Sequence, residues 1–189
     1  MSSSYKTIVF IGDCIGKTCF ISQLKNQVYP TDFCPTVFDC CSIEREIGGK
    51  MRKLSLYDSS GLSDLLEIRK KLYGPSRLFV ICFSVVSKRS FDQVVLNWIP
   101  EVKAYSPNSP YFLLGLQTDL RNDNRTNINN LDRTVYTKDE GKIYAVTINA
   151  LGYSECSNRS VEEVKAAFDD ICKAFFPERK FSLFHHGSK

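Results

Sequence analysis

Three apolar runs constrain the fold of this chain more than any other feature of its sequence. YKTIVFI (5–11), RLFVICFSV (77–85) and YFLLGL (111–116) hold almost no charged residues, as strands covered on both faces do. Segments with helical spacing of apolar residues lie between such runs, for example SFDQVVLNWIPEV (90–102). Strands alternating with helices predict an α/β domain with a mostly parallel sheet.

Local patterns predict the other elements of the first half. CSIEREI (41–47) and MRKLSLYD (51–58) flank Gly48-Gly49, a good two-residue turn for a β-hairpin. Within the helix at 90–102, Pro100 predicts a kink or an early end. The residues expected on the buried face of that helix are Phe91, Val94, Val95, Trp98, Ile99 and Val102.

The second half ends in a further strand and helix. The stretch 121–133 is polar and Asn-rich, which predicts an excursion outside the core. A helix near 138–149 and a short strand GYSEC (152–156) should follow. The last helix should open at Ser160 with a capping box, S-V-E-E. It should bury Val161, Val164, Phe168, Ile171 and Phe175.

Composition excludes several classes of protein. A length of 189 residues with 43% hydrophobic and 24% charged residues fits one ordinary globular domain. The net charge of +4 is spread along the chain, which argues against a dedicated nucleic-acid binder. The 8 cysteines form no C-x-x-C pair and no leader peptide precedes them, so we expect reduced thiols and a cytoplasmic protein. The longest apolar run is too short to span a bilayer.

The first apolar run opens into GDCIGKT (12–18), which resembles a phosphate-binding loop. A strand, a glycine-bracketed turn and a helix start create a nest of backbone N–H groups for an anion. Lys17 would reach the outer phosphates, and the Thr18 hydroxyl would bind Mg²⁺. The usual pattern is G-x-x-x-x-G-K-[ST], whereas only three residues separate Gly12 from Gly16 here.

Three further polar sites follow predicted strands. DSSG (58–61) offers a carboxylate for Mg²⁺ through water and a glycine amide for a terminal phosphate. Asp119 follows YFLLGL and would accept hydrogen bonds from both N1–H and N2–H of guanine, which adenine cannot supply. ECS (155–157) would bring backbone amides to the guanine oxygen. Ligands of open α/β sheets bind at the carboxyl ends of strands, so these sites together predict a guanine-nucleotide site.

On these residues the sequence resembles a Rho-family small GTPase, nearest the Rac/Cdc-type branch, over residues 5–176. The segments that carry the resemblance are YPTDFCPTVFDCCS (29–42), LYDSSG (56–61), RLFVICFSVVSKRSFDQVVLNWIPEV (77–102), LQTDLRNDN (116–124) and GYSECS (152–157). The resemblance implies a P-loop G domain over 1–178, with a mostly parallel six-stranded sheet and helices on both faces. It also implies a Rho-type insert near 121–134. The end of the chain, 179–189, has no periodic pattern, which predicts a flexible tail.

The resemblance also implies a role for each matching position. Phosphate-binding positions are Gly12, Asp13, Cys14, Ile15, Gly16, Lys17, Thr18, Cys19, Thr36 and Gly61. Metal positions are Thr18, Thr36 and Asp58, and guanine positions are Tyr29, Gln117, Asp119, Ser157 and Asn158. Val37, Phe38 and Asp39 would present the effector surface of the first switch. The implied ligands are GTP or GDP with Mg²⁺, and the implied partners are effectors and exchange factors.

The chain departs from the family pattern at several positions of the expected nucleotide site and at its end. The family loop is GDGAVGKT, one residue longer, and Leu62 stands where the family has the Gln that orients the attacking water. Gln117 and Leu116 replace a Lys and a Thr or Asn, and Asn158 replaces a small Ala. The chain ends in HGSK without a prenylation cysteine, so we expect no direct lipid anchor and only peripheral membrane attachment through partners.

These departures lead to one main hypothesis and three alternatives. The main one is an atypical Rho-type GTP-binding switch with weak or absent hydrolysis, mainly GTP-bound, signalling to actin-regulatory or membrane-trafficking effectors. No residue is a confident catalytic candidate, because Leu62 lacks the needed polar group. The alternatives are a conventional slow GTPase, a nucleotide-free pseudo-GTPase scaffold and, more distantly, a P-loop kinase.

Overall fold

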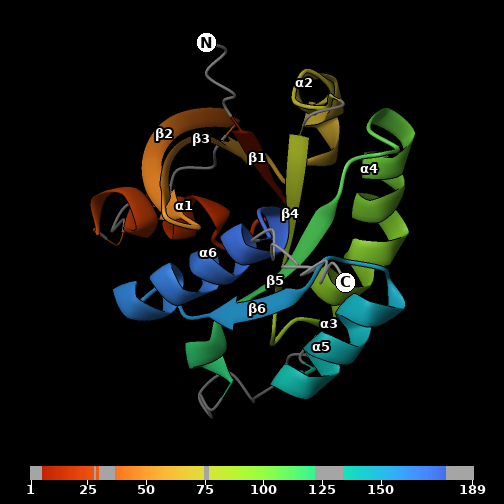
Figure 1. Cartoon of the computed structure of the whole chain (residues 1–189). Coiled ribbons are helices and arrows are strands. Elements are labelled where there is room, and N and C mark those ends of the chain that lie inside the picture. Colours follow the sequence, from red (N-terminus) through yellow and green to blue (C-terminus); the bar gives the residue numbers. More distant parts are fainter. Residues whose placement is uncertain (1–5, 28, 30–36, 75–76, 122–133, 178–189) are drawn as a thin grey trace, which may run out of the picture.

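Six strands form one sheet in the order β2-β3-β1-β4-β5-β6 (Figure 1). The computed structural model describes residues 6–27, 29, 37–74, 77–121 and 134–177. The strands are β1 (Lys6–Ile11), β2 (Phe38–Ile47), β3 (Lys50–Ser59), β4 (Arg77–Ser84), β5 (Tyr111–Leu116) and β6 (Tyr153–Cys156). All neighbours are parallel except β2 and β3, so the mostly parallel α/β sheet expected from the sequence is confirmed.

The predicted hairpin joins the two antiparallel strands. β2 and β3 pair from Phe38 opposite Ser59 to Ile47 opposite Lys50. Gly48 and Gly49 have φ values of 58° and 68°, which suit the left-handed turn that matches the twist of a hairpin.

Helices cover both faces of the sheet (Figure 1). They are α1 (Lys17–Asn26), α2 (Leu66–Lys70), α3 (Lys88–Gln93), α4 (Ile99–Tyr105), α5 (Lys138–Thr147) and α6 (Val161–Phe175). Alternate residues of β1 point to opposite faces: Ile8 and Phe10 join a core cluster with α1 and α6, whereas Val9 and Ile11 join one with α3, α4 and α5. The two clusters explain why the central strands are apolar throughout.

Of the two outcomes predicted at Pro100, the early end is wrong. The helix continues, because Val94–Trp98 form a π-helical turn and α4 runs on to Tyr105. In that turn the N–H of Ile99 reaches the carbonyl of Val94, five residues back. A wider turn just before proline accommodates its missing N–H and its ring. Val95, expected on the buried face, is exposed as a result.

The last helix begins where predicted, but its cap differs in part. Ser160 accepts the backbone N–H of Glu163, as a capping box requires. The Glu163 carboxylate instead accepts the N–H of Ser157, in the loop after β6. Val164, Phe168 and Ile171 are buried as expected, whereas Val161 and Phe175 are only half-buried. Glu163 therefore organises the loop that precedes the helix.

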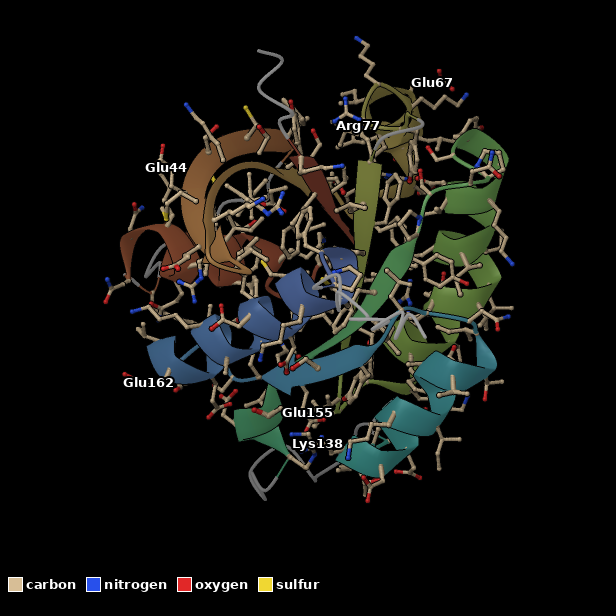
Figure 2. The ribbon with its side chains drawn as sticks, viewed as in Figure 1. Glu44, Glu67, Arg77, Lys138, Glu155 and Glu162 are labelled. Atoms are coloured by element: carbon tan, nitrogen blue, oxygen red, sulfur yellow. The ribbon has the colours of Figure 1, made fainter. Side chains whose placement is uncertain are left out.

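Many charged side chains lie on the surface, outside this core. Figure 2 shows Glu44 on β2, Glu67 on α2 and Glu162 on α6 at the periphery, and all three are exposed. No helix among the described residues is long and apolar enough to cross a membrane. The expectations for Thr36, for most of the insert near 121–134 and for the tail at 179–189 lie outside the described residues.

Candidate functional site

The loops that follow β1, β3, β5 and β6 carry the expected site residues. These four strands run parallel, so their carboxyl ends meet at one edge of the sheet. The strand order also reverses direction between β1 and β4, where ligands of doubly wound folds bind. The fold thus brings together residues that are distant in sequence.

The phosphate loop, residues 12–18, wraps around the Lys17 side chain. Lys17 is 5% exposed and its Nζ donates to the carbonyls of Gly12 and Asp13, both at 2.7 Å. Burial lowers the pKa of Lys17, which Asp58 and other neighbours partly counteract. Gly16 precedes α1 with φ of 103°, a left-handed conformation that favours glycine. A helix N-terminus beside a buried lysine suits an anion.

The shortened loop makes a bond within itself. The N–H of Ile15 donates to the carbonyl of Asp13 at 2.9 Å, so one amide of the expected nest is satisfied by the protein. Ile15 is buried and Cys14 is exposed. The loop therefore fits a phosphate through its helix start and Lys17, but with fewer amides available than a longer loop offers.

Thr18 and Asp58 lie side by side, as a shared metal ligand set requires. The Thr18 hydroxyl donates to Asp58 Oδ2 at 2.5 Å, and Asp58 is buried at the end of β3. Hydroxyl and carboxylate oxygens are the donors that Mg²⁺ prefers, so these residues fit the ion. Thr36, the third expected ligand, lies outside the described residues.

Gly61 and Leu62 follow β3 and pack against the phosphate loop. A Cβ at Gly61 would lie 2.5 Å from the carbonyl oxygen of Gly12, so no larger residue fits without a shift. The Leu62 side chain is 49% exposed. The N–H of Leu62 donates to Ser60 Oγ at 3.2 Å, and the Ser59 hydroxyl donates to the carbonyl of Phe10 at 2.7 Å. Neither serine hydroxyl is left without a protein partner.

A buried arginine, which sequence reasoning did not single out, holds this segment. Arg69 on α2 donates to the carbonyls of Ser60 and Leu62, at 3.2 and 2.5 Å. It also makes two bonds to the Glu101 carboxylate, at 2.8 and 2.9 Å, and lies over the Trp98 ring. No periodic pattern marks such a residue, since its partners come from distant elements.

Trp98 has a role beyond the core packing expected for it. Its indole N–H donates to Asp13 Oδ1 at 3.1 Å, joining the π-helical turn to the phosphate loop. Burial raises the pKa of Asp13, against the opposing effects of Trp98 and Lys17. A buried indole N–H usually needs an acceptor, so the tryptophan itself was the sequence signal that a polar contact should be sought here. A cavity of about 830 Å³, lined in part by Asp13, Leu62 and Trp98, lies beside this contact.

The expected guanine residues surround a small base pocket. The pocket has a volume of about 100 Å³. It is lined by Ile15, Gly16, Cys19, Tyr29, Gln117, Asp119, Leu120, Asn158 and Arg159. Four of the five sequence-predicted guanine residues are therefore brought together, and Ser157 contacts the pocket residue Asp119.

Both oxygens of the Asp119 carboxylate have protein partners. Ser157 Oγ donates to Oδ1 at 2.9 Å, and the Arg159 guanidinium lies 3.2 Å from Oδ2. Arg159 also lies over the exposed Tyr29 ring, 5.8 Å from its centre. A guanine that binds Asp119 would therefore share its oxygens with Ser157 and with Arg159, a residue that sequence reasoning missed.

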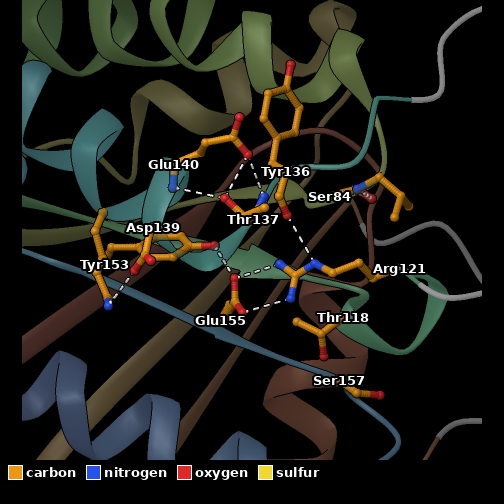
Figure 3. Close-up of polar contacts among 12 residues, drawn as sticks. Ser84, Thr118, Arg121, Tyr136, Thr137, Asp139, Glu140, Tyr153, Glu155 and Ser157 are labelled. Atoms are coloured by element: carbon orange, nitrogen blue, oxygen red, sulfur yellow. Dashed lines mark hydrogen bonds and ion pairs between the residues drawn. The ribbon is translucent and has the colours of Figure 1, made fainter.

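A second network fastens the base pocket to the sheet (Figure 3). Arg121 makes two bonds to the Glu155 carboxylate, at 3.0 and 2.8 Å, and one to the carbonyl of Tyr136 at 3.0 Å. The Tyr153 hydroxyl donates to the same carboxylate at 2.6 Å. Burial raises the pKa of Glu155, but the bonds from Arg121 and Tyr153 outweigh it and leave the pKa below its usual range. The turn after β5 is thus tied to β6.

The expected effector residues lie at the start of β2. Val37, Phe38 and Asp39 are all exposed. Phe38 packs partly on Tyr57 of β3, with ring centres 5.7 Å apart, and Asp39 Oδ1 accepts the N–H of Cys40 at 2.7 Å. Val37 and Phe38 thus leave an exposed apolar surface at the start of β2.

The fold and this strand-end site define a P-loop protein of the small-GTPase class. A comparison with protein-family models matches residues 6–176 to the Ras family, and the chain belongs to that family. It is therefore a GTP-binding switch protein of a class that binds GTP or GDP with Mg²⁺ and acts through effectors and exchange factors.

Proposed function

We propose that this small GTPase is an atypical Rho-type switch that hydrolyses GTP slowly or not at all and stays mainly GTP-bound. The observation that carries the proposal is Leu62, where the water-orienting glutamine is expected. A leucine side chain has neither a donor nor an acceptor for the attacking water.

Several polar side chains near Leu62 already make other contacts. The Ser59 hydroxyl donates to the carbonyl of Phe10, the Ser60 hydroxyl accepts the N–H of Leu62, and Arg69 is engaged with Glu101 and two carbonyls. A GTPase-activating partner's arginine is worth about 10³–10⁵ in rate, or roughly 4–7 kcal/mol of barrier, and the loss of water orientation should be of the same order. We expect most of that acceleration to be absent.

A switch without a hydrolytic timer would be controlled by other means. Cellular GTP exceeds GDP, so exchange would load GTP, and abundance or the supply of partners would set the signal. Effectors would read the surface of Val37, Phe38 and Asp39, and by resemblance they would be actin-regulatory or membrane-trafficking proteins. The proposal takes residues 1–178 as one G domain with a Rho-type insert, and any membrane contact as peripheral.

Two observations favour a second candidate, a nucleotide-free scaffold. The Ile15 amide is satisfied by Asp13, and Arg159 lies against the base-recognising carboxylate of Asp119. Both features weaken a nucleotide site. The fit of Thr18, Asp58 and Lys17 to Mg²⁺ and phosphate favours the switch. A conventional slow GTPase is the third candidate and needs another group to orient water.

The nucleotide carried by the purified protein separates these candidates. The full chain is denatured without added nucleotide, and the released nucleotide is identified by ion-exchange chromatography. Single-turnover hydrolysis is then measured on GTP-loaded protein, on Leu62→Gln and on Leu96→Gln. Leu96 is an exposed leucine of the π-helical turn, so it controls for the change of side chain.

Three outcomes each select one candidate, and a fourth locates the defect. Stoichiometric GTP and hydrolysis that Leu62→Gln restores, with Leu96→Gln unchanged, would support the proposal. Stoichiometric GDP with wild-type turnover would make it a conventional GTPase. No nucleotide, together with no binding of added GTP, would make it a scaffold. If GTP is bound but Leu62→Gln gives no hydrolysis, the shortened loop rather than Leu62 is the larger defect.

A further inference from the structure

Asn158 connects the base pocket to the phosphate loop. It lies in the loop after β6 and is only 7% exposed. Its side-chain Nδ2 donates to the carbonyl of Gly16 at 2.9 Å. From the other side, Gln23 of α1 donates through Nε2 to the backbone carbonyl of Asn158 at 2.9 Å. Two hydrogen bonds thus join segments that lie more than 130 residues apart in the chain.

The acceptor of the first bond is well placed to fix the phosphate loop. The Gly16 carbonyl also accepts the N–H of Phe20 at 3.0 Å, the bond that begins α1. A Cβ at Gly16 would lie 2.8 Å from Asn158 Nδ2, so the close contact depends on glycine. The amide of Asn158 therefore lies against the helix start that is expected to hold the phosphates.

A contribution to stability does not explain why an asparagine occupies position 158. Its Oδ1 is buried and accepts no hydrogen bond from the described protein, and the same is true of Gln23 Oε1. Buried acceptors without donors cost stability, and an alanine would avoid that cost at position 158. Leu116, at the neighbouring end of β5, is fully buried and has no polar group that could make the connection instead.

We propose that Asn158 is a positioning residue that holds the base pocket at a fixed distance from the phosphate loop. This inference rests on the proposed nucleotide binding. A nucleotide contacts both places at once, so each contact raises the effective concentration of the other. A fixed separation also lowers the ordering cost of binding. Without the connection, the nucleotide would dissociate more readily from both the base pocket and the phosphate loop. This should hold for any base and any number of phosphates.

The test is nucleotide release from Asn158→Ala. Release of fluorescent GDP, GTP and inosine diphosphate is measured by stopped-flow displacement with Mg²⁺ present. We expect release of all three to accelerate about three- to tenfold by the same factor, as loss of one hydrogen bond implies. Asn158→Asp keeps the shape but turns a carboxylate oxygen toward the Gly16 carbonyl, so it should accelerate release further. Asn108→Ala changes an exposed asparagine before the amino end of β5, away from the strand ends that carry the site, and should have no effect.

Two results would overturn the inference. Unchanged release in Asn158→Ala, even with a lower melting temperature, would make the residue merely structural. A change confined to the guanine-over-inosine preference would mean that Asn158 contacts the base and does not position the loops.

Hydrogen exchange separates a failure of this inference from a failure of nucleotide binding. In nucleotide-free protein, Asn158→Ala should accelerate exchange in residues 12–24 and 153–160, relative to α5 as an internal reference. If the protein binds no nucleotide, the proposed function fails, while faster exchange in those two segments would still support the connection. Equal exchange in both proteins would overturn it.

Discussion

Replacing Arg69 by alanine should destabilise the protein more than replacing any arginine in a surface ion pair. The side chain is only 3% exposed and makes two hydrogen bonds to Glu101 and two to the carbonyls of Ser60 and Leu62. Burial works against its charge, but Glu101 and Tyr73 stabilise the ion and raise the pKa of Arg69. Truncation of Arg69 would leave the largely buried Glu101 carboxylate without its arginine partner.

The contacts set the size of the effect. Breaking a buried, hydrogen-bonded ion pair by removing one partner costs about 3–5 kcal/mol. A domain of ordinary stability has about 5–15 kcal/mol in total, so Arg69→Ala should lose a large fraction of it. Arg69→Met combined with Glu101→Leu removes both charges and should cost clearly less than the single change, because no buried charge remains unpaired.

Urea unfolding followed by circular dichroism measures these differences. Arg45→Ala is the matched control, since Arg45 pairs with Asp169 at a partly exposed position, where a pair is worth at most about 1 kcal/mol. An Arg69→Ala midpoint no lower than that of Arg45→Ala would refute the assignment of Arg69 as the residue that holds residues 60–62. So would a double variant as unstable as the single one.

Two further predictions concern the sheet edge. Glu155 has its pKa held below its usual range, so its contribution to stability is present above the unfolded pKa and is lost as pH falls through the folded one. Glu155→Gln should therefore cost about 1–3 kcal/mol at pH 7 and less in acid, below the unfolded pKa. Urea midpoints at both pH values check this, with Glu67→Gln as an exposed control. Gly12→Ala should be far more destabilising than Gly49→Ala, because its Cβ would lie 2.3 Å from the Cys82 carbonyl oxygen whereas nothing lies within 4 Å at Gly49. Equal shifts in melting temperature for the two glycine variants would contradict this steric argument.

The pattern of apolar residues was enough to predict the strands that are covered by protein on both faces. β1, β4 and β5 are apolar throughout because both faces are covered, and this pattern is visible in the sequence alone. The hairpin at Gly48 was equally visible from its turn residues. The continuation of the helix through Pro100 could not be predicted in this way, since a π-helical turn depends on how the whole helix packs on the sheet.

The residue types of the candidate site could also be predicted from the sequence. The order of a glycine-bracketed loop, a strand-end aspartate and Asp119 predicted which loops meet, because parallel strands place their carboxyl ends at one edge. Leu62 was identified from its position in the resemblance alone. These conclusions depend on residue type and order, which the sequence contains.

Only the tertiary structure decided how those loops are held and which of their groups are already engaged. Arg69 joins α2 to Glu101, Arg159 lies on the Asp119 carboxylate, and Asn158 joins the loop after β6 to Gly16. Each contact joins residues from separate elements, so its distance and burial arise from packing and from no local pattern. Sequence by itself determined the fold and the residue types of the nucleotide site, whereas three-dimensional packing determined which polar atoms remain for a ligand.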